Sequence, residues 1–241
     1  MNTIRTVSDT KRAFYTIHTR PVNSIYRRVV EELMVEMHLL SVNVDFRYDP
    51  IYALGVTTTF DRFMKGYRPE HDRDSIFNAL CRAIEHDPQQ YRHDVENVKA
   101  EASDLTVDDF LSRVENLGDS ESQGIFAILK GIKERSSFKY SRLFAIGLYT
   151  LLEIIDADVV SNETRRDDVL AKVCSAIQIS AEKVQKDLEL YRSNLEKISQ
   201  AQAVLEDVLK ADRKKRSQQA QEDEKEPEAV ATPPDDSPDA S

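Results

Sequence analysis

The chain has 241 residues, 40% of them hydrophobic and 32% charged, which is enough apolar material to bury a core in one large domain or two small ones. Only two cysteines are present, Cys81 and Cys174, so the sequence offers neither a disulfide framework nor a cysteine-rich metal site and suits a reducing compartment. The formal charge of -10 comes mostly from residues 217–241, which hold eight carboxylates and one lysine. The remainder is therefore almost balanced.

The N-terminus is basic and lacks the features of a leader. It has neither the apolar segment of a secretory signal nor a Ser- and Arg-rich transit sequence, so we expect no signal or transit peptide. Its cations would suit an anionic lipid surface or an acidic partner, although a solvated helix face explains them without any partner. Against Asp9 alone, these cations are Arg5, Lys11, Arg12, Arg20, Arg27 and Arg28.

Helical periodicity dominates the N-terminal half. Ser8 is expected to cap a short first helix that ends before Pro21. A longer amphipathic helix follows, and Asp49 with Pro50 marks the start of a later one. The apolar stripe of the longer helix recurs at steps of four and three, at Tyr26, Val30, Leu33, Met37, Leu40 and Val44.

Residues 141–156 form the most apolar stretch. Large apolar side chains cover every side of a helix there, so no face remains for water and we predict a buried central helix. The uncharged run from Leu143 to Leu152 is too short to cross a bilayer, which needs roughly 20 apolar residues. The segment that follows, 156–163, is interpreted as a turn before the next helix.

From Ser180 the apolar spacing becomes an unbroken heptad pattern, which predicts a long coiled-coil helix over residues 180–216. The pattern leaves open whether this seam folds back on the helical body, residues 1–179, or pairs with another chain. Residues 217–241 are charged and Pro-rich and are expected to be disordered. The seam has one polar position and consists of Val184, Leu188, Tyr191, Leu195, Ile198, Gln202, Leu205 and Leu209.

No pattern in the sequence supplies catalytic, metal or cofactor chemistry. Six scattered glycines form no phosphate-binding loop, and the five histidines show neither of the usual helical metal spacings. The basic cluster at 210–216 lacks interleaved aromatic residues, so we expect no nucleic-acid partner. We predict an all-α protein without catalytic residues, metal or cofactor, built as a multi-helix globular bundle around the central helix with a long C-terminal coiled-coil helix.

Two stretches in the N-terminal half carry a resemblance to a known family. The first reads TVSDTKRAFYTIHTRPVNSIYRRVVEELMVEMHLLSVN, and the second reads DFRYDPIYALGVTTTFDRFMKGY. Together they resemble the thylakoid formation protein family, which comprises accessory proteins of photosystem II biogenesis and repair in cyanobacteria and chloroplasts. The later helices also resemble the body of that family in length and order, and the acidic Pro-rich tail lies outside it.

The resemblance implies a non-enzymatic protein of the cyanobacterial type, held peripherally on the cytoplasmic side of the thylakoid membrane. It implies three partners: an FtsH-type membrane protease complex whose accumulation the protein supports, photosystem II assembly or repair components, and the thylakoid membrane itself. Two alternatives stay open, namely a ligand- or pigment-handling helical protein and a peripheral binder of anionic membranes.

The family has no catalytic motif to transfer to this chain. If a partner-binding surface lies in the shared block, we expect it among basic and aromatic residues. Several of them would serve equally well to tie helices together. The set is Arg12, Arg20, Tyr26, Arg27, Arg28, Arg47 and Tyr48.

Overall fold

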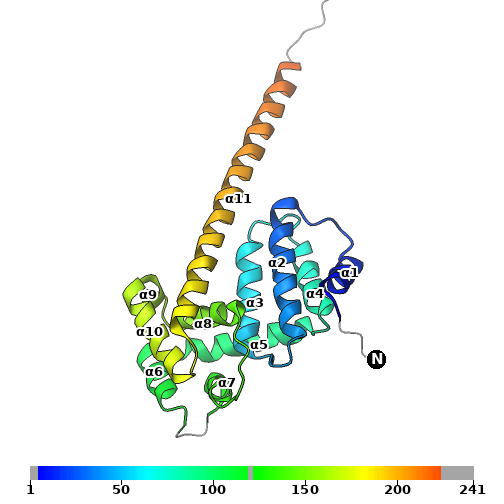
Figure 1. The fold of residues 1–241 in the computed structure, drawn as a ribbon. Coiled ribbons are helices and arrows are strands. Elements are labelled where there is room, and N and C mark those ends of the chain that lie inside the picture. Colours follow the sequence, from blue (N-terminus) through cyan, green and yellow to red (C-terminus); the bar gives the residue numbers. More distant parts are fainter. Residues whose placement is uncertain (1–4, 119–121, 224–241) are drawn as a thin grey trace, which may run out of the picture. The chain divides into compact units, whose positions relative to one another are not determined.

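The computed structural model describes residues 5–118 and 122–223, and in that part the chain forms eleven helices and no strand (Figure 1). The predicted all-α class is therefore confirmed. The chain divides into two compact units, residues 1–198 and 199–241. The helices are α1 (Val7–Ile17), α2 (Ser24–Ser41), α3 (Pro50–Phe63), α4 (Asp72–Ala83), α5 (Pro88–Ser103), α6 (Val107–Glu115), α7 (Gly124–Lys133), α8 (Arg142–Ile155), α9 (Ala157–Ser161), α10 (Glu163–Ala176) and α11 (Ala181–Asp223).

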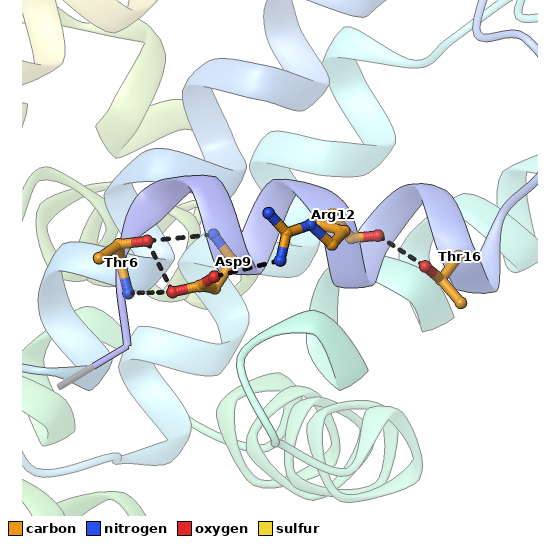
Figure 2. Close-up of polar contacts among 4 residues, drawn as sticks. All are labelled: Thr6, Asp9, Arg12 and Thr16. Carbon is orange, nitrogen blue, oxygen red and sulfur yellow. Dashed lines mark hydrogen bonds and ion pairs between the residues drawn. The ribbon is translucent and has the colours of Figure 1, made fainter. Parts of the chain in front are cut away.

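The first helix begins earlier than the sequence suggested. Thr6, and not Ser8, is the N-cap of α1: its hydroxyl accepts a hydrogen bond from the backbone N–H of Asp9 at 3.2 Å. The Asp9 carboxylate in turn accepts one from the backbone N–H of Thr6 at 3.1 Å (Figure 2). This reciprocal pair satisfies two free N–H groups at once, which a serine cap two residues later would not do.

The prediction of a simple turn over 156–163 was also wrong. A short helix, α9, lies there, because the Asp156 carboxylate accepts hydrogen bonds from the backbone N–H groups of Asp158 and Val159. Val159 and Val160 are both buried. A helix of this length is not stable by itself, and the burial of these two side chains stabilises it.

The core is built where α3 meets α8. Every residue of α8 from Leu143 to Leu152 is buried, and Ser141 caps the helix by accepting a hydrogen bond from the N–H of Phe144 at 3.0 Å. The two helices cross at Gly55 and Gly147, where the backbone of each lies directly against the other. Side chains are absent from the crossing point, so the two helices approach as closely as their main chains permit.

The first part of α11 packs on the body of the same chain. Val184, Leu188 and Tyr191 are buried, and Leu195 and Ile198 are partly buried against the core.

Further along, Gln202 is half-exposed, and the side chains of Leu205 and Leu209 lie outside the described part of the structure. The helix continues to Asp223, past the expected boundary at residue 216, so the prediction of disorder was wrong for residues 217–223. The rest of the predicted disordered tail, residues 224–241, lies outside the described part of the structure. Pairing of the seam with another chain was left open as an alternative, and nothing in the structure of this single chain tests it.

Among the described helices, none combines the length and the apolar character that crossing a bilayer would need.

Candidate functional site

A groove of about 1130 Å³ follows one face of α2 from Ser24 to Asn43. Its other wall is the segment Lys139–Arg142, which leads into α8. We call this hollow the α2 groove. α2 also packs on α3 and on α1.

Three ion pairs neutralise most of the charge along the α2 groove. Glu31 pairs with Lys11 of α1 at 2.9 Å, which holds the pKa of its carboxyl below the usual value of 4.5. Arg28 pairs with Glu32 at 2.8 Å, one helical turn away, and Arg142 of α8 reaches Glu36 at 2.6 Å.

Two cations in the α2 groove are left over. In the described residues neither Arg27 nor Lys139 forms an ion pair. Arg27 donates a long hydrogen bond, 3.4 Å, to the backbone carbonyl of Val22, and its charge helps to lower the pKa of Glu31. Unpaired cations on opposite walls of a groove favour a partner that brings carboxylates. The groove thus carries a small excess of positive charge.

Exposed apolar side chains gather at the C-terminal end of α2. Leu39, which lines the groove, is 55% exposed, and the turn after the helix leaves Val42 40% and Val44 82% exposed. Single exposed apolar residues are ordinary, but three within six positions beside a groove are typical of a surface that another molecule covers.

The structure places only two of the seven expected partner-binding residues in this groove. Arg27 and Arg28 line it. Tyr26 points the other way and is buried, its hydroxyl donating to the backbone carbonyl of Lys65 at 3.3 Å and its ring meeting Tyr67 edge to face.

The other four residues are engaged in local ties. Arg12 pairs with Asp9 on the outer face of α1 (Figure 2). Arg20 pairs with Asp72, which is 97% buried. Tyr48 donates a hydrogen bond of 2.8 Å to Asp94. The Arg47 guanidinium donates to the carbonyls of Val44 and Phe46 in its own turn. Of these four residues, only Arg20 and Tyr48 contact a different element, α4 and α5 respectively, while Arg12 and Arg47 make contacts within their own helix or turn.

Three residues of the groove were not predicted from the sequence: Lys139, Arg142 and Leu39. Nothing in the sequence brings 139–142 next to α2, since the approach depends on how α8 packs. Leu39 did leave a signal, because it is a large apolar residue off the buried stripe of its own helix. An apolar residue on the polar face of an amphipathic helix indicates a contact beyond the core.

Both cysteines are buried, and burial raises the pKa of Cys81 to about 12 and that of Cys174 to about 11. Both thiols therefore stay protonated at neutral pH, and a protonated thiol is a poor nucleophile and metal ligand. Within residues 5–118 and 122–223, no group of three or more His, Cys, Asp or Glu side chains is placed to hold a metal ion.

Two buried histidines attach α1 to its neighbours. His38 Nδ1 of α2 lies 2.9 Å from Thr10 Oγ1, and His18 Nδ1 lies 2.9 Å from Ser75 Oγ of α4. Burial is the main cause that lowers the pKa of both rings below 6.5. Nearby charges also act: Arg5 lowers and Asp9 raises the pKa of His38, while Asp72 raises and Arg20 lowers that of His18.

We expect these histidines to make the protein less stable in mild acid. A base whose pKa is lower in the folded state binds fewer protons there than in the unfolded state, so stability is lost as pH falls through 6.5. Asp49 acts in the opposite sense, because burial raises its pKa to about 6 and its protonation favours the folded state. Because the two effects oppose each other, the histidine effect is measured by comparing two proteins. Between pH 7.5 and 5.5, the midpoint of thermal unfolding should fall further for the natural chain than for His38→Gln. If the midpoint fell equally in both proteins, His38 would not be a cause of the lower stability in acid.

Comparison with known proteins identifies what the chain is similar to. The family model described as "Thylakoid formation protein" matches residues 6–220. A protein named Thf1 from Trichormus variabilis is 58% identical over 225 residues, covering 92% of this chain and 96% of that one. Thf1 from Synechocystis is 51% identical over 220 residues, covering 91% and 92%. A solved structure of Psb29 superposes with a TM-score of 0.80 at 46% identity, covering 88% of this chain and 99% of the other.

Proposed function

Because the chain belongs to the thylakoid formation protein family, we propose that it is a non-enzymatic accessory protein of photosystem II biogenesis and repair. In this proposal it supports the accumulation of thylakoid FtsH protease complexes through protein contacts, from a peripheral position on the cytoplasmic side of the membrane. The observation that carries the proposal is the family match across residues 6–220, together with the likeness to Psb29 over nearly all of that chain.

The mechanism we propose is mass action. A protein that binds the assembled protease and not its separated subunits shifts the assembly equilibrium and lengthens the lifetime of the complex without any chemistry. The two protonated, buried thiols and the ties that hold Arg20 and Tyr48 fit a protein whose polar groups serve its own packing.

We propose the α2 groove as the contact surface. It runs along an 18-residue helix, which corresponds to about 27 Å, a length that suits a partner helix lying in the groove. Leu39 would supply apolar contact at one end of the groove, and Arg27 and Lys139 would each attract a carboxylate. The complementary partner surface is an amphipathic helix with an apolar stripe flanked by acidic residues.

Reversing the charge at Arg27 should therefore weaken retrieval of the protease. Solubilised thylakoid membranes would be passed over the immobilised full chain, and we expect Arg27→Glu to retain several-fold less FtsH than the natural chain, since like charges facing across an interface are repulsive. Arg165→Glu is the matched control, because Arg165 is also an exposed helical arginine but lies on α10. Equal loss with both variants would point to general charge effects and would remove the groove from the proposal.

A strain lacking the protein tests the function itself. Under strong light we expect it to accumulate less FtsH protease than the parent strain, and unchanged protease levels would contradict the proposed role whatever surface is used.

A further inference from the structure

Another hollow, of about 310 Å³, lies between the end of α7 and the junction of α10 with α11, within residues 1–198. We call it the α7–α11 pocket. Its walls are tied together by two contacts of Tyr140 with α11. The Tyr140 hydroxyl donates a hydrogen bond of 2.7 Å to the Asp187 carboxylate, and Lys183 Nζ lies 4.6 Å from the centre of the Tyr140 ring. Apart from Tyr140, the described residues of this pocket do not line the α2 groove, so they play no part in the proposed function.

The lining of the α7–α11 pocket is positively charged. Lys133 of α7, Arg135 of the segment after it and Lys183 of α11 all line it, and its described lining contains no carboxylate. In the described residues none of these three cations forms an ion pair. The charge of Arg135 does help to lower the pKa of Asp49, but burial outweighs this effect and raises that pKa to about 6. An anion inside the pocket would therefore meet three cations and no carboxylate on its walls.

Arg135 carries a donor without an acceptor. One nitrogen of its guanidinium, Nη1, is buried and has no hydrogen-bond partner in the described residues. A buried donor that meets no acceptor costs free energy, and it costs more on a charged group than on a neutral one. The planar guanidinium presents paired N–H groups that match two oxygens of one phosphate. A phosphate bound in the pocket would supply the acceptors that Arg135 lacks.

The size and the remaining lining of the pocket favour a small organic anion. A volume of 310 Å³ corresponds to a sphere about 8 Å across, which is comparable with the Debye length at physiological ionic strength, so charges on every wall act on an anion inside. Uncharged hydrogen-bonding groups come from Ser136, Gln178 and Ser180. The apolar part of the lining consists of Ile132, Phe138, Ile177 and Ile179.

We propose that the α7–α11 pocket binds a small phosphate monoester. A monoester carries a charge of about −1.5 to −2 at pH 7 and three acceptor oxygens, which suits three cations better than the single charge of a carboxylate. Arg135 binds two of the oxygens, Lys133 and Lys183 neutralise the remaining charge, and the organic group lies against the apolar lining. The free phosphate ion and phospholipid headgroups offer the same chemistry, and the test separates these sources.

The test is isothermal titration calorimetry of the full chain with phenyl phosphate, in which a compact apolar ring carries the phosphate. We expect one binding site per chain. Benzoate, which has one charge on the same ring, and inorganic phosphate, which has no ring, should both bind more weakly. Absence of saturable binding of phenyl phosphate would overturn the proposal, and so would equal binding of benzoate.

Two further outcomes would assign the cations to another source of phosphate. Equal binding of inorganic phosphate and phenyl phosphate would make the occupant the free ion. Sedimentation of the chain with phosphatidylglycerol vesicles, without binding of phenyl phosphate, would make it a lipid surface. Either result would overturn the monoester.

Two variants locate the site, and a third on α11 is their matched control. Arg135→Gln removes the guanidinium, and we expect the affinity to fall about tenfold or more, as for hydrogen bonds between charged groups. Lys183→Gln removes an exposed cation and should lower the affinity about twofold to fivefold. Lys186→Gln makes the same charge change three residues further along α11, where the exposed side chain lies outside the pocket, so the affinity should stay within about twofold of the natural chain.

Thermal unfolding of each variant without ligand checks that the fold is kept. Lys183 is exposed, so Lys183→Gln should fold normally and tests the site even if Arg135→Gln does not fold. Equal loss of affinity in Lys183→Gln and Lys186→Gln would show a general effect of charge, and the proposal would be wrong. The measurement uses the isolated chain, so its outcome is independent of whether the protein supports the protease.

Discussion

Replacing Gly147 with alanine is expected to destabilise the protein by about 3–5 kcal/mol, and the same change at Gly55 should do comparable harm. A Cβ atom at Gly147 would overlap the backbone carbonyl of Ile51 and crowd the backbone nitrogen of Gly55. One at Gly55 would overlap the carbonyl of Leu143. The obstructing atoms belong to helix backbones, so no side chain can move aside, and α3 and α8 would have to separate.

The reason for so large an effect is the position of this crossing. α8 is buried over ten consecutive residues, and α3 and α8 make the most extensive helix contact in the described part of the chain. Moving them apart opens gaps along the whole interface, and each lost contact adds to the strain at the glycine. Domains of this size are stable by only about 5–15 kcal/mol, so either variant should show a much lower midpoint of urea unfolding.

Gly131 is the matched control for this experiment. It also lies inside a helix, α7, but a Cβ atom there would have no heavy atom within 4 Å. Gly131→Ala should therefore be stabilising by about 0.5–1 kcal/mol, because alanine loses less backbone entropy on folding. If Gly147→Ala and Gly131→Ala shifted the midpoint in the same direction, the close crossing of α3 and α8 would be wrong.

How much of the fold the sequence predicts depends on the range of the interactions. A helix start that a side chain sets within its own turn was predicted correctly at Asp49, whose carboxylate accepts a hydrogen bond from the backbone N–H of Tyr52 three residues on. The start of α1 was missed because Thr6 and Ser8 are both good caps, and only the reciprocal bond to Asp9 distinguishes them. The short α9 was missed because its stability comes from the burial of Val159 and Val160 by distant residues.

The site was harder to predict than the fold. Basic residues that look alike in the sequence differ in what lies opposite them: Arg20 meets the buried Asp72, while Arg27 lies on an open groove. The second wall of that groove, Lys139–Arg142, comes from a region about 100 residues further along the chain. Periodicity reports which face of a helix is apolar, but it does not report which distant segment will border the polar face.

Replacing Arg20 with alanine is expected to lower the free energy of unfolding by about 2–3 kcal/mol. Asp72, in the first turn of α4, has only 3% of its side chain exposed, and removal of Arg20 would leave its carboxylate buried without an arginine partner. His71 lies 3.4 Å away but compensates only when it is protonated. Breaking a fully buried pair costs about 3–5 kcal/mol; the lower figure here reflects the half-exposed Arg20 side chain.

The double variant separates this structural role from a role in partner binding. If loss of the Arg20–Asp72 ion pair causes the destabilisation, the uncompensated carboxylate of Asp72 is responsible, and Asp72→Asn removes its charge. The double variant Arg20→Ala with Asp72→Asn should then be more stable to urea than Arg20→Ala alone. Arg12→Ala is the control, because Arg12 is 79% exposed and its pair with Asp9 lies in solvent, so stability should not change measurably. Unchanged stability of Arg20→Ala with reduced retrieval of the protease would instead assign Arg20 to the partner surface, because a residue that ties α1 to α4 cannot be removed without weakening the fold.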